Sequence, residues 1–67
     1  MIQVTINGAP QRFDSPLPVS ALIDRMALAG KKIAVERNGE IIPRGLHQEV
    51  LVEDGDQLEI VVAVGGG

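Results

Sequence analysis

Alternating apolar and polar residues open the chain and predict a β-hairpin. The apolar positions of residues 2–6 alternate with polar ones, which is typical of a strand with one buried face. The pair Asn7-Gly8 follows and suits the positive φ angles of a type I′ turn, so we expect a second strand over residues 9–13. Pro10 lacks a backbone N–H, which places this second strand at an edge of the sheet. We expect residues 14–18 to form a loop.

The spacing of apolar residues changes after Pro18 and predicts a helix. Four apolar residues follow at positions i, i+3, i+4 and i+7, the stripe of an amphipathic helix of about nine or ten residues. Pro18 suits the first turn, where no N–H is needed, and Gly30 is expected to mark the end. So short a helix is marginal in water by itself, so it should pack on the sheet. The stripe consists of Val19, Leu22, Ile23 and Met26.

The second half of the chain predicts three more strands. A strand around residues 33–36, the turn Asn38-Gly39 and a short segment over 40–42 would form a second hairpin. Residues 44–49 lack a clean period, and we expect a loop with one helical turn. An acidic turn over 53–56 then leads into a last strand, residues 57–63.

The order of these elements predicts an α+β fold, with a mixed sheet and one amphipathic helix packed on one face. The predicted domain covers residues 1–64. Gly65, Gly66 and Gly67 follow it. Glycine loses more backbone entropy than other residues when it is fixed, so we expect residues 65–67 to form a projecting, mobile tail.

Composition excludes several classes of function. The chain has 67 residues, aromatic residues make up 1% of them, and cysteine is absent, which rules out disulfides and thiolate metal sites. The formal net charge is −3 and the six basic residues are spread along the sequence, so we expect no nucleic-acid binding. No run of apolar residues is long enough for a membrane span, and the cytoplasm is the expected location.

Side chains that could carry chemistry are few. His47 is the sole histidine and lies in the aperiodic region, so we expect it to be exposed and without a catalytic or metal-binding role. The acidic residues 53–56 lack the spacing of an EF-hand loop and are better explained as a turn. We expect no metal site. The pair Lys31-Lys32 is expected to be a solvated loop.

Three segments resemble the ThiS family of sulfur carrier proteins, which serve thiamin thiazole biosynthesis and have the ubiquitin-like β-grasp fold. The segments are residues 34–44 (AVERNGEIIPR), 53–60 (EDGDQLEI) and 64–67 (VGGG). With the first hairpin, the resemblance covers essentially the whole chain. A terminal Gly-Gly is shared with ubiquitin-like modifiers and with the small subunits of molybdopterin synthases, whereas the stretch NGEIIPR and the short length point to the thiamin branch.

The resemblance implies a function for the end of the chain. An E1-like adenylyltransferase would use ATP and magnesium to adenylate the carboxylate of Gly67, which sulfur would then convert to a thiocarboxylate. A sulfur donor system such as a cysteine desulfurase would supply the sulfur, and a thiazole synthase would receive it. Gly65 and Gly66 would let the tail thread a narrow channel, because they have no Cβ. The chain would then be a carrier and not an enzyme, with no cofactor of its own.

Partner recognition is expected on the sheet face opposite the helix. If Leu58, Ile60 and Val62 point inward, then Glu59, Val61 and Ala63 point outward beside the tail. Val61 and Ala63 would form a small apolar strip, with Arg44 or Glu59 as a charge at its rim that fixes the register of docking. Ordinary surface apolarity explains such a strip equally well.

Other functions remain open at this point. A covalent protein modifier would use the same fold and tail but end as an isopeptide on a lysine. The small subunit of a molybdopterin synthase would insert its tail stably into a large catalytic subunit. A plain interaction module would keep its partner binding when the last two glycines are deleted.

Overall fold

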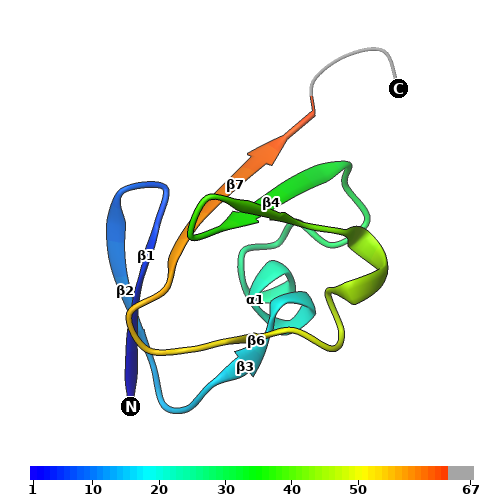
Figure 1. Ribbon diagram of the computed structural model, residues 1–67. Coiled ribbons are helices and arrows are strands. Elements are labelled where there is room, and N and C mark those ends of the chain that lie inside the picture. The colour runs from blue at the N-terminus through cyan, green and yellow to red at the C-terminus, as the bar shows by residue number, and fades with distance from the viewer. Residues whose placement is uncertain (64–67) are drawn as a thin grey trace.

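The computed structural model describes residues 1–63 and shows a five-stranded mixed sheet with one helix against one face (Figure 1). The strand order is β2-β1-β7-β4-β5. Strands β1 and β7 are parallel, and the other neighbours are antiparallel. The last strand therefore lies in the middle of the sheet. The bounds are β1 (Ile2–Ile6), β2 (Ala9–Phe13), β4 (Ile33–Arg37), β5 (Glu40–Ile42) and β7 (Gln57–Val62).

Both predicted Asn-Gly turns are confirmed. Asn7 and Gly8 have φ angles of 51° and 83°, and Asn38 and Gly39 have 51° and 87°, as a type I′ turn requires. Strand β2, which contains Pro10, lies at the edge of the sheet as expected. The two hairpins that flank the helix, β1 with β2 and β4 with β5, thus have the turns that the sequence predicts.

The helix α1 (Val19–Arg25) is seven residues long, shorter than its apolar stripe predicts. After its last turn, the Leu28 N–H donates to the Ile23 carbonyl oxygen at 3.1 Å, the long bond of a Schellman motif. Ala27 occupies the left-handed position of this motif, with φ 59°. The prediction that Gly30 marks the end of the helix is therefore wrong, because an alanine takes the position that glycine usually fills.

A single apolar core lies between the sheet and the helix. It includes Leu17 and Val52, from two short strands that the sequence pattern does not predict. These strands, β3 (Leu17–Pro18) and β6 (Leu51–Val52), form a separate antiparallel pair. Two residues are too few to show an alternation, and for this reason the pattern assigned Leu17 to a loop. The buried apolar side chains are Ile2, Val4, Ile6, Leu17, Val19, Leu22, Ile23, Val35, Ile42, Val52, Leu58 and Ile60.

His47 is buried, and the prediction that it is exposed is wrong. It follows the short 3₁₀ helix η1 (Arg44–Leu46), and 7% of its surface is exposed. Its Nε2 donates to the Ile42 carbonyl oxygen at 3.1 Å, and its own carbonyl oxygen accepts from the Ser20 N–H at 2.8 Å. His47 therefore joins β5 to the start of α1, which is a structural role.

Two further observations bear on the sequence predictions. In the part of the chain that the structure describes, no helix has the length and apolar character needed to cross a membrane. The glycine tail over residues 65–67 and the predicted domain boundary at residue 64 lie outside the described residues.

Candidate docking site at the end of the last strand

Strand β7 carries the chain to the root of the tail, and two neighbours hold it. Its pairing with β1 covers only Gln57 and Leu58, while its pairing with β4 continues to Val62. Beyond the strand, the Ala63 N–H donates to the Lys32 carbonyl oxygen at 2.8 Å. The last described residue is thus fixed to the segment that leads into β4. In Figure 1, β7 runs through the sheet toward the C-terminus and away from the N-terminus.

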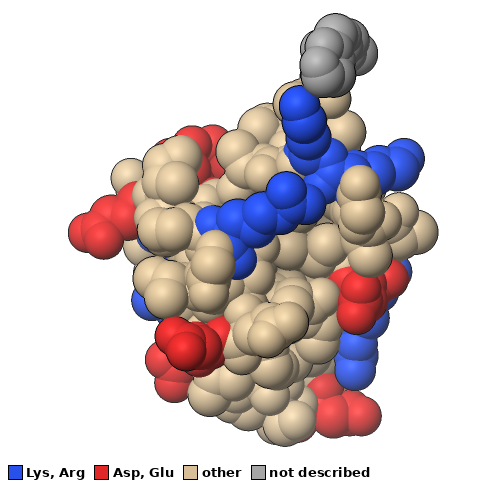
Figure 2. Space-filling model, turned by 90° about the vertical axis from the view of Figure 1, so that its right-hand side faces the viewer, with Lys and Arg blue, Asp and Glu red and all other residues tan. Residues whose placement is uncertain are grey.

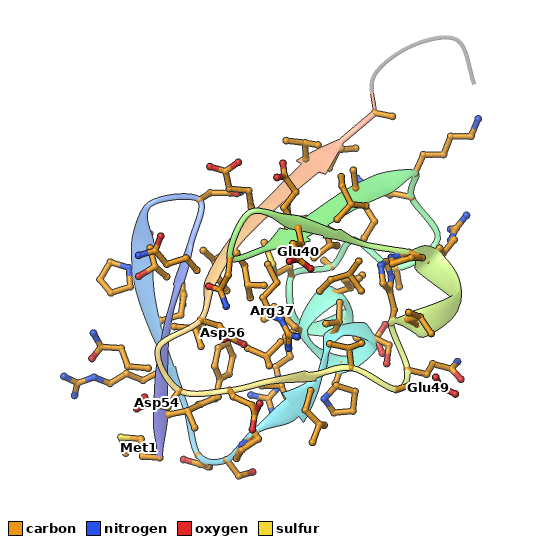
Figure 3. The ribbon with its side chains drawn as sticks, in the orientation of Figure 1. Met1, Arg37, Glu40, Glu49, Asp54 and Asp56 are labelled. Carbon is orange, nitrogen blue, oxygen red and sulfur yellow. The ribbon has the colours of Figure 1, made fainter. Side chains whose placement is uncertain are left out.

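The acidic turn before β7 is fixed by hydrogen bonds within the fold. The Asp54 Oδ1 accepts from the Gln3 N–H at 2.8 Å, and the Asp56 Oδ2 accepts from the Glu53 N–H at 2.9 Å. Asp56 also lies beside Arg37, with Oδ2 and the guanidinium nitrogen 3.8 Å apart (Figure 3). These contacts involve the carboxylates of Asp54 and Asp56, and residues 54 and 55 form the turn that the sequence predicts. Within residues 1–63, no group of three or more His, Asp or Glu side chains is placed to hold a metal.

Three of the four predicted docking residues lie together beside the root of the tail. Arg44, Val61 and Ala63 line one open depression of about 360 Å³. Val61 points to the sheet face opposite the helix and is 60% exposed. The alternation along β7 thus gives the orientation that the sequence predicts for Val61. The full lining of the depression is Lys32, Ile33, Ala34, Arg44, Val61 and Ala63.

Glu59 lies apart from this depression. It is two residues before Val61 on the same face of β7, and it is directly opposite Glu36 of β4. Glu59 and Glu36 line a different shallow hollow, together with residues of the second hairpin turn. The outer face of the sheet is therefore acidic toward that turn and apolar toward the tail.

Sequence reasoning missed three contributors to the depression, Lys32, Ile33 and Ala34. Ala34 is exposed and directly opposite Val61 in the pairing of β4 with β7. Because Val35 is buried, the alternation along β4 places Ala34 on the outer face, so this signal was present in the sequence. Lys32 had no such signal, since its position depends on the backbone contact with Ala63.

Known proteins similar to this chain include two thiazole synthases and the protein ycf40. The chain is 42% identical over 66 residues to a thiazole synthase from Paramagnetospirillum magneticum, a match that covers 98% of this chain and 20% of that protein. A thiazole synthase from Magnetococcus marinus is 32% identical over 66 residues, which again cover 98% of this chain and 20% of that protein. The chain thus spans about a fifth of the length of these relatives. The protein ycf40 of Porphyra purpurea is 33% identical over 66 residues, which cover 98% of this chain and 93% of ycf40.

A solved structure confirms the predicted fold class. The crystal structure of the thiamine biosynthesis protein ThiS from Geobacter metallireducens matches with a TM-score of 0.84 and 33% identity, over 98% of this chain and 100% of that one. The predicted β-grasp architecture, a mixed sheet with one helix, is therefore correct. The family model described as the ThiS family matches residues 4–67, nearly the whole sequence. On these grounds the chain belongs to the ThiS family.

Proposed function

We propose that this protein is a sulfur carrier in the synthesis of the thiamin thiazole and that Gly67 carries the sulfur as a thiocarboxylate. The observation that carries the proposal is the match to the ThiS family over residues 4–67, which includes all three terminal glycines. The fold supports it, because β7 is held in the middle of the sheet and leads directly to this segment.

The chemistry begins with activation of a carboxylate, which is a poor acyl donor by itself. An oxygen of the Gly67 carboxylate attacks the α-phosphorus of ATP, and the bond from that phosphorus to pyrophosphate breaks. A sulfur nucleophile, with hydrosulfide as the simplest example, then attacks the acyl carbon. The new C–S bond replaces the C–O bond to AMP, which leaves. No electrons are gained or lost in these two steps.

The protein itself supplies positioning and not catalysis. Its sole histidine is occupied in a structural contact with Ile42, and the carboxylates of the acidic turn bind backbone N–H groups or neighbouring side chains. Catalysis is therefore assigned to the partner, which must align the tail with the nucleotide. The chain acts as a co-substrate, and magnesium and ATP belong to the partner.

We assign three partners to the carrier, all in the cytoplasm. An E1-like adenylyltransferase activates Gly67, a donor system such as a cysteine desulfurase supplies sulfur, and a thiazole synthase accepts it. Two relatives that contain a segment similar to this chain are named thiazole synthases, which supports the last assignment. Arg44, Val61 and Ala63 form the docking surface next to the tail, and Glu59 lies outside it on the same face of the sheet.

The intact mass of the chain tests the proposal directly. The full chain is incubated with an E1-like adenylyltransferase from the same source, ATP, magnesium and sulfide, and its mass is measured. We expect the increase that corresponds to one oxygen replaced by sulfur. Deletion of Gly66 and Gly67 should abolish the increase, and Gly66→Ala should slow it strongly while the urea midpoint stays unchanged.

Each alternative product would contradict the proposal. An unchanged mass, under conditions that convert a known ThiS carrier, would remove its main support. A conjugate linked to lysine would identify a protein modifier instead. Rescue of a molybdenum-cofactor auxotroph, but not of a thiamin auxotroph, would place the chain with the molybdopterin synthases.

A further inference from the structure

Three basic residues lie on the side of the fold where the described chain ends, and we call Lys31, Lys32 and Arg44 the cationic collar. All three are exposed. Arg44 lines the depression beside the tail together with Lys32, and it lines a second hollow of about 500 Å³ together with Lys31. Figure 2 shows Lys and Arg side chains clustered on this face, close to the point where the described chain ends.

The cationic collar is held in place by the backbone that carries the tail. The Lys32 carbonyl oxygen accepts from the Ala63 N–H at 2.8 Å, so the base of the Lys32 side chain is fixed next to the root of the tail. The Lys31 N–H donates to the Leu28 carbonyl oxygen at 3.1 Å, which fixes the preceding turn. The backbone from which the two lysine side chains extend is therefore fixed next to the point where the described chain ends.

None of the three collar side chains forms an ion pair with another residue in the described part of the fold. Among residues 1–63, the structure holds one ion pair, between Arg37 and Asp56. Asp24 lines the same hollow as Lys31 and Arg44 but forms no ion pair with either. The field of the collar therefore extends into solvent, where it acts on an approaching partner.

The collar contrasts with the charge of the remaining chain. The protein has six basic and nine acidic residues, and the collar holds three of the six. The other residues thus contribute three positive and nine negative charges, a sum of −6, and the positive end of the molecule is at the tail. Such an arrangement orients the molecule during approach to an acidic surface.

We propose that the cationic collar docks on an acidic rim around the mouth of the channel in the E1-like adenylyltransferase that receives the tail. This inference rests on the proposed function, which requires that the tail enter such a channel. Residues 64–67 span at most about 14 Å when fully extended. A tail fully stretched through a channel would place the reacting carboxylate up to about 14 Å beyond Ala63. The collar then contacts the protein surface around the channel and not the nucleotide inside it.

An acidic protein surface fits the collar better than a nucleic acid does. No Phe, Tyr or Trp lines either hollow, and the His47 ring is buried, so the described residues there offer no platform for stacking bases. The net charge of −3 opposes binding to a polyanion. Immediately beside Lys32 and Arg44, Ala34 and Val61 supply apolar surface, the combination of apolar centre and charged rim that protein interfaces have.

Charge reversal in the collar tests the proposal. The variants Lys32→Glu and Arg44→Glu are compared with Arg12→Glu, which makes the same charge change on the edge strand β2. The association rate constant with the E1-like adenylyltransferase is measured at low salt and near 1 M salt, where the Debye length falls to about 3 Å. We expect the collar variants to associate about tenfold more slowly at low salt and Arg12→Glu to change the rate much less. The difference should largely disappear at high salt.

Several outcomes would overturn the proposal. Equal effects of Lys32→Glu and Arg12→Glu would show that only net charge matters. An effect of Lys32→Glu that persists at high salt would exclude an electrostatic contact. Binding of the free chain to a DNA duplex or to ATP, lost in Lys32→Glu, would identify a different ligand for the collar.

The experiment also separates the collar from the proposed function. Association is measured without turnover, so it reports on docking even if the wild-type chain gains no sulfur. Conversely, saturating concentrations of the adenylyltransferase should restore the normal mass increase in Lys32→Glu, because the collar does not touch the reacting atoms. Urea midpoints of all variants show whether each remains folded.

Discussion

The side chain of Asn7 bonds to the backbone of Ile60 in both directions. Its Nδ2 donates to the Ile60 carbonyl oxygen at 3.0 Å, and its Oδ1 accepts from the Ile60 N–H at 2.8 Å. Asn7 thereby continues the hydrogen bonding of β1 with β7 beyond Leu58, where the paired residues end. The Oδ1 of Asn38, in the other hairpin turn, accepts from the Gln57 N–H at 2.9 Å. Both turn asparagines therefore hold the strand that leads to the tail.

Replacement of Asn7 by glycine separates this contact from the turn itself. Asn7→Gly keeps the left-handed conformation accessible but removes both hydrogen bonds to Ile60. We expect the free energy of unfolding to fall by about 1–3 kcal/mol, since two partly buried backbone groups lose their partners. Urea denaturation measures this change. A loss no larger than that of Gln11→Gly, a change at an exposed position of the edge strand β2, would contradict the assigned role.

The two asparagines show what the sequence could and could not predict. The pair Asn-Gly predicts a type I′ turn from local conformation alone, and both turns are confirmed. The bond from Asn7 to Ile60 joins residues 53 positions apart, so no local pattern contains it. The pairing of β3 with β6 was missed for the same reason, because it joins residues distant in sequence. The bond from the Ser20 N–H to the His47 carbonyl oxygen, which holds His47 against the start of α1, also joins residues distant in sequence.

The residues of the candidate site likewise differ in whether a local sequence pattern predicts their position. Alternation within β7 correctly placed Val61 on the outer face of the sheet, since a strand has a fixed period. The grouping of Arg44 with Val61 depends on how the 3₁₀ segment packs beside β4, and the sequence predicted Arg44 only as one of two charges at the rim of the apolar strip. Neither an alternation nor a predicted rim charge indicated Lys32. The position of Gly67 lies outside the described residues, and its role stays a prediction.

Ala27 offers a way to stabilise the fold. It ends the helix with φ 59°, a conformation that costs an alanine energy but is accessible to glycine. We therefore expect Ala27→Gly to raise the free energy of unfolding by about 1 kcal/mol in urea denaturation. Ala29→Gly is the matched control, because Ala29 does not have a positive φ angle. A gain in both variants, or in neither, would show that the conformation of Ala27 is not the cause.

The directly opposed carboxylates of Glu36 and Glu59 are expected to destabilise the free protein. Like charges at opposite positions of an antiparallel pair repel one another, so Glu59→Gln should raise the free energy of unfolding by about 0.2–1 kcal/mol at low salt. The gain should shrink as added salt screens the repulsion. Glu40→Gln is a control that should lower the free energy of unfolding, since Glu40 lies directly opposite the positively charged Arg37 in the pairing of β4 with β5. If Glu59→Gln is neutral at low salt, the two carboxylates do not repel measurably.

Val61 should contribute to partner binding more than to stability. Its side chain is 60% exposed on the outer face of the sheet, next to the root of the tail, so a charged residue there should lower the stability of the free protein little. The same substitution places a carboxylate in the predicted docking surface, where binding of the partner would bury it. We expect Val61→Asp to weaken the affinity for the E1-like adenylyltransferase about tenfold or more, because burial of a valine contributes roughly 1.5–3 kcal/mol. Leu51→Asp makes the same kind of change at a 46% exposed position on β6, away from the depression, and should leave the affinity unchanged. Titration calorimetry with each variant measures the affinity, and urea midpoints check the fold. Equal affinities for Val61→Asp and the wild type would show that Val61 is ordinary exposed apolar surface.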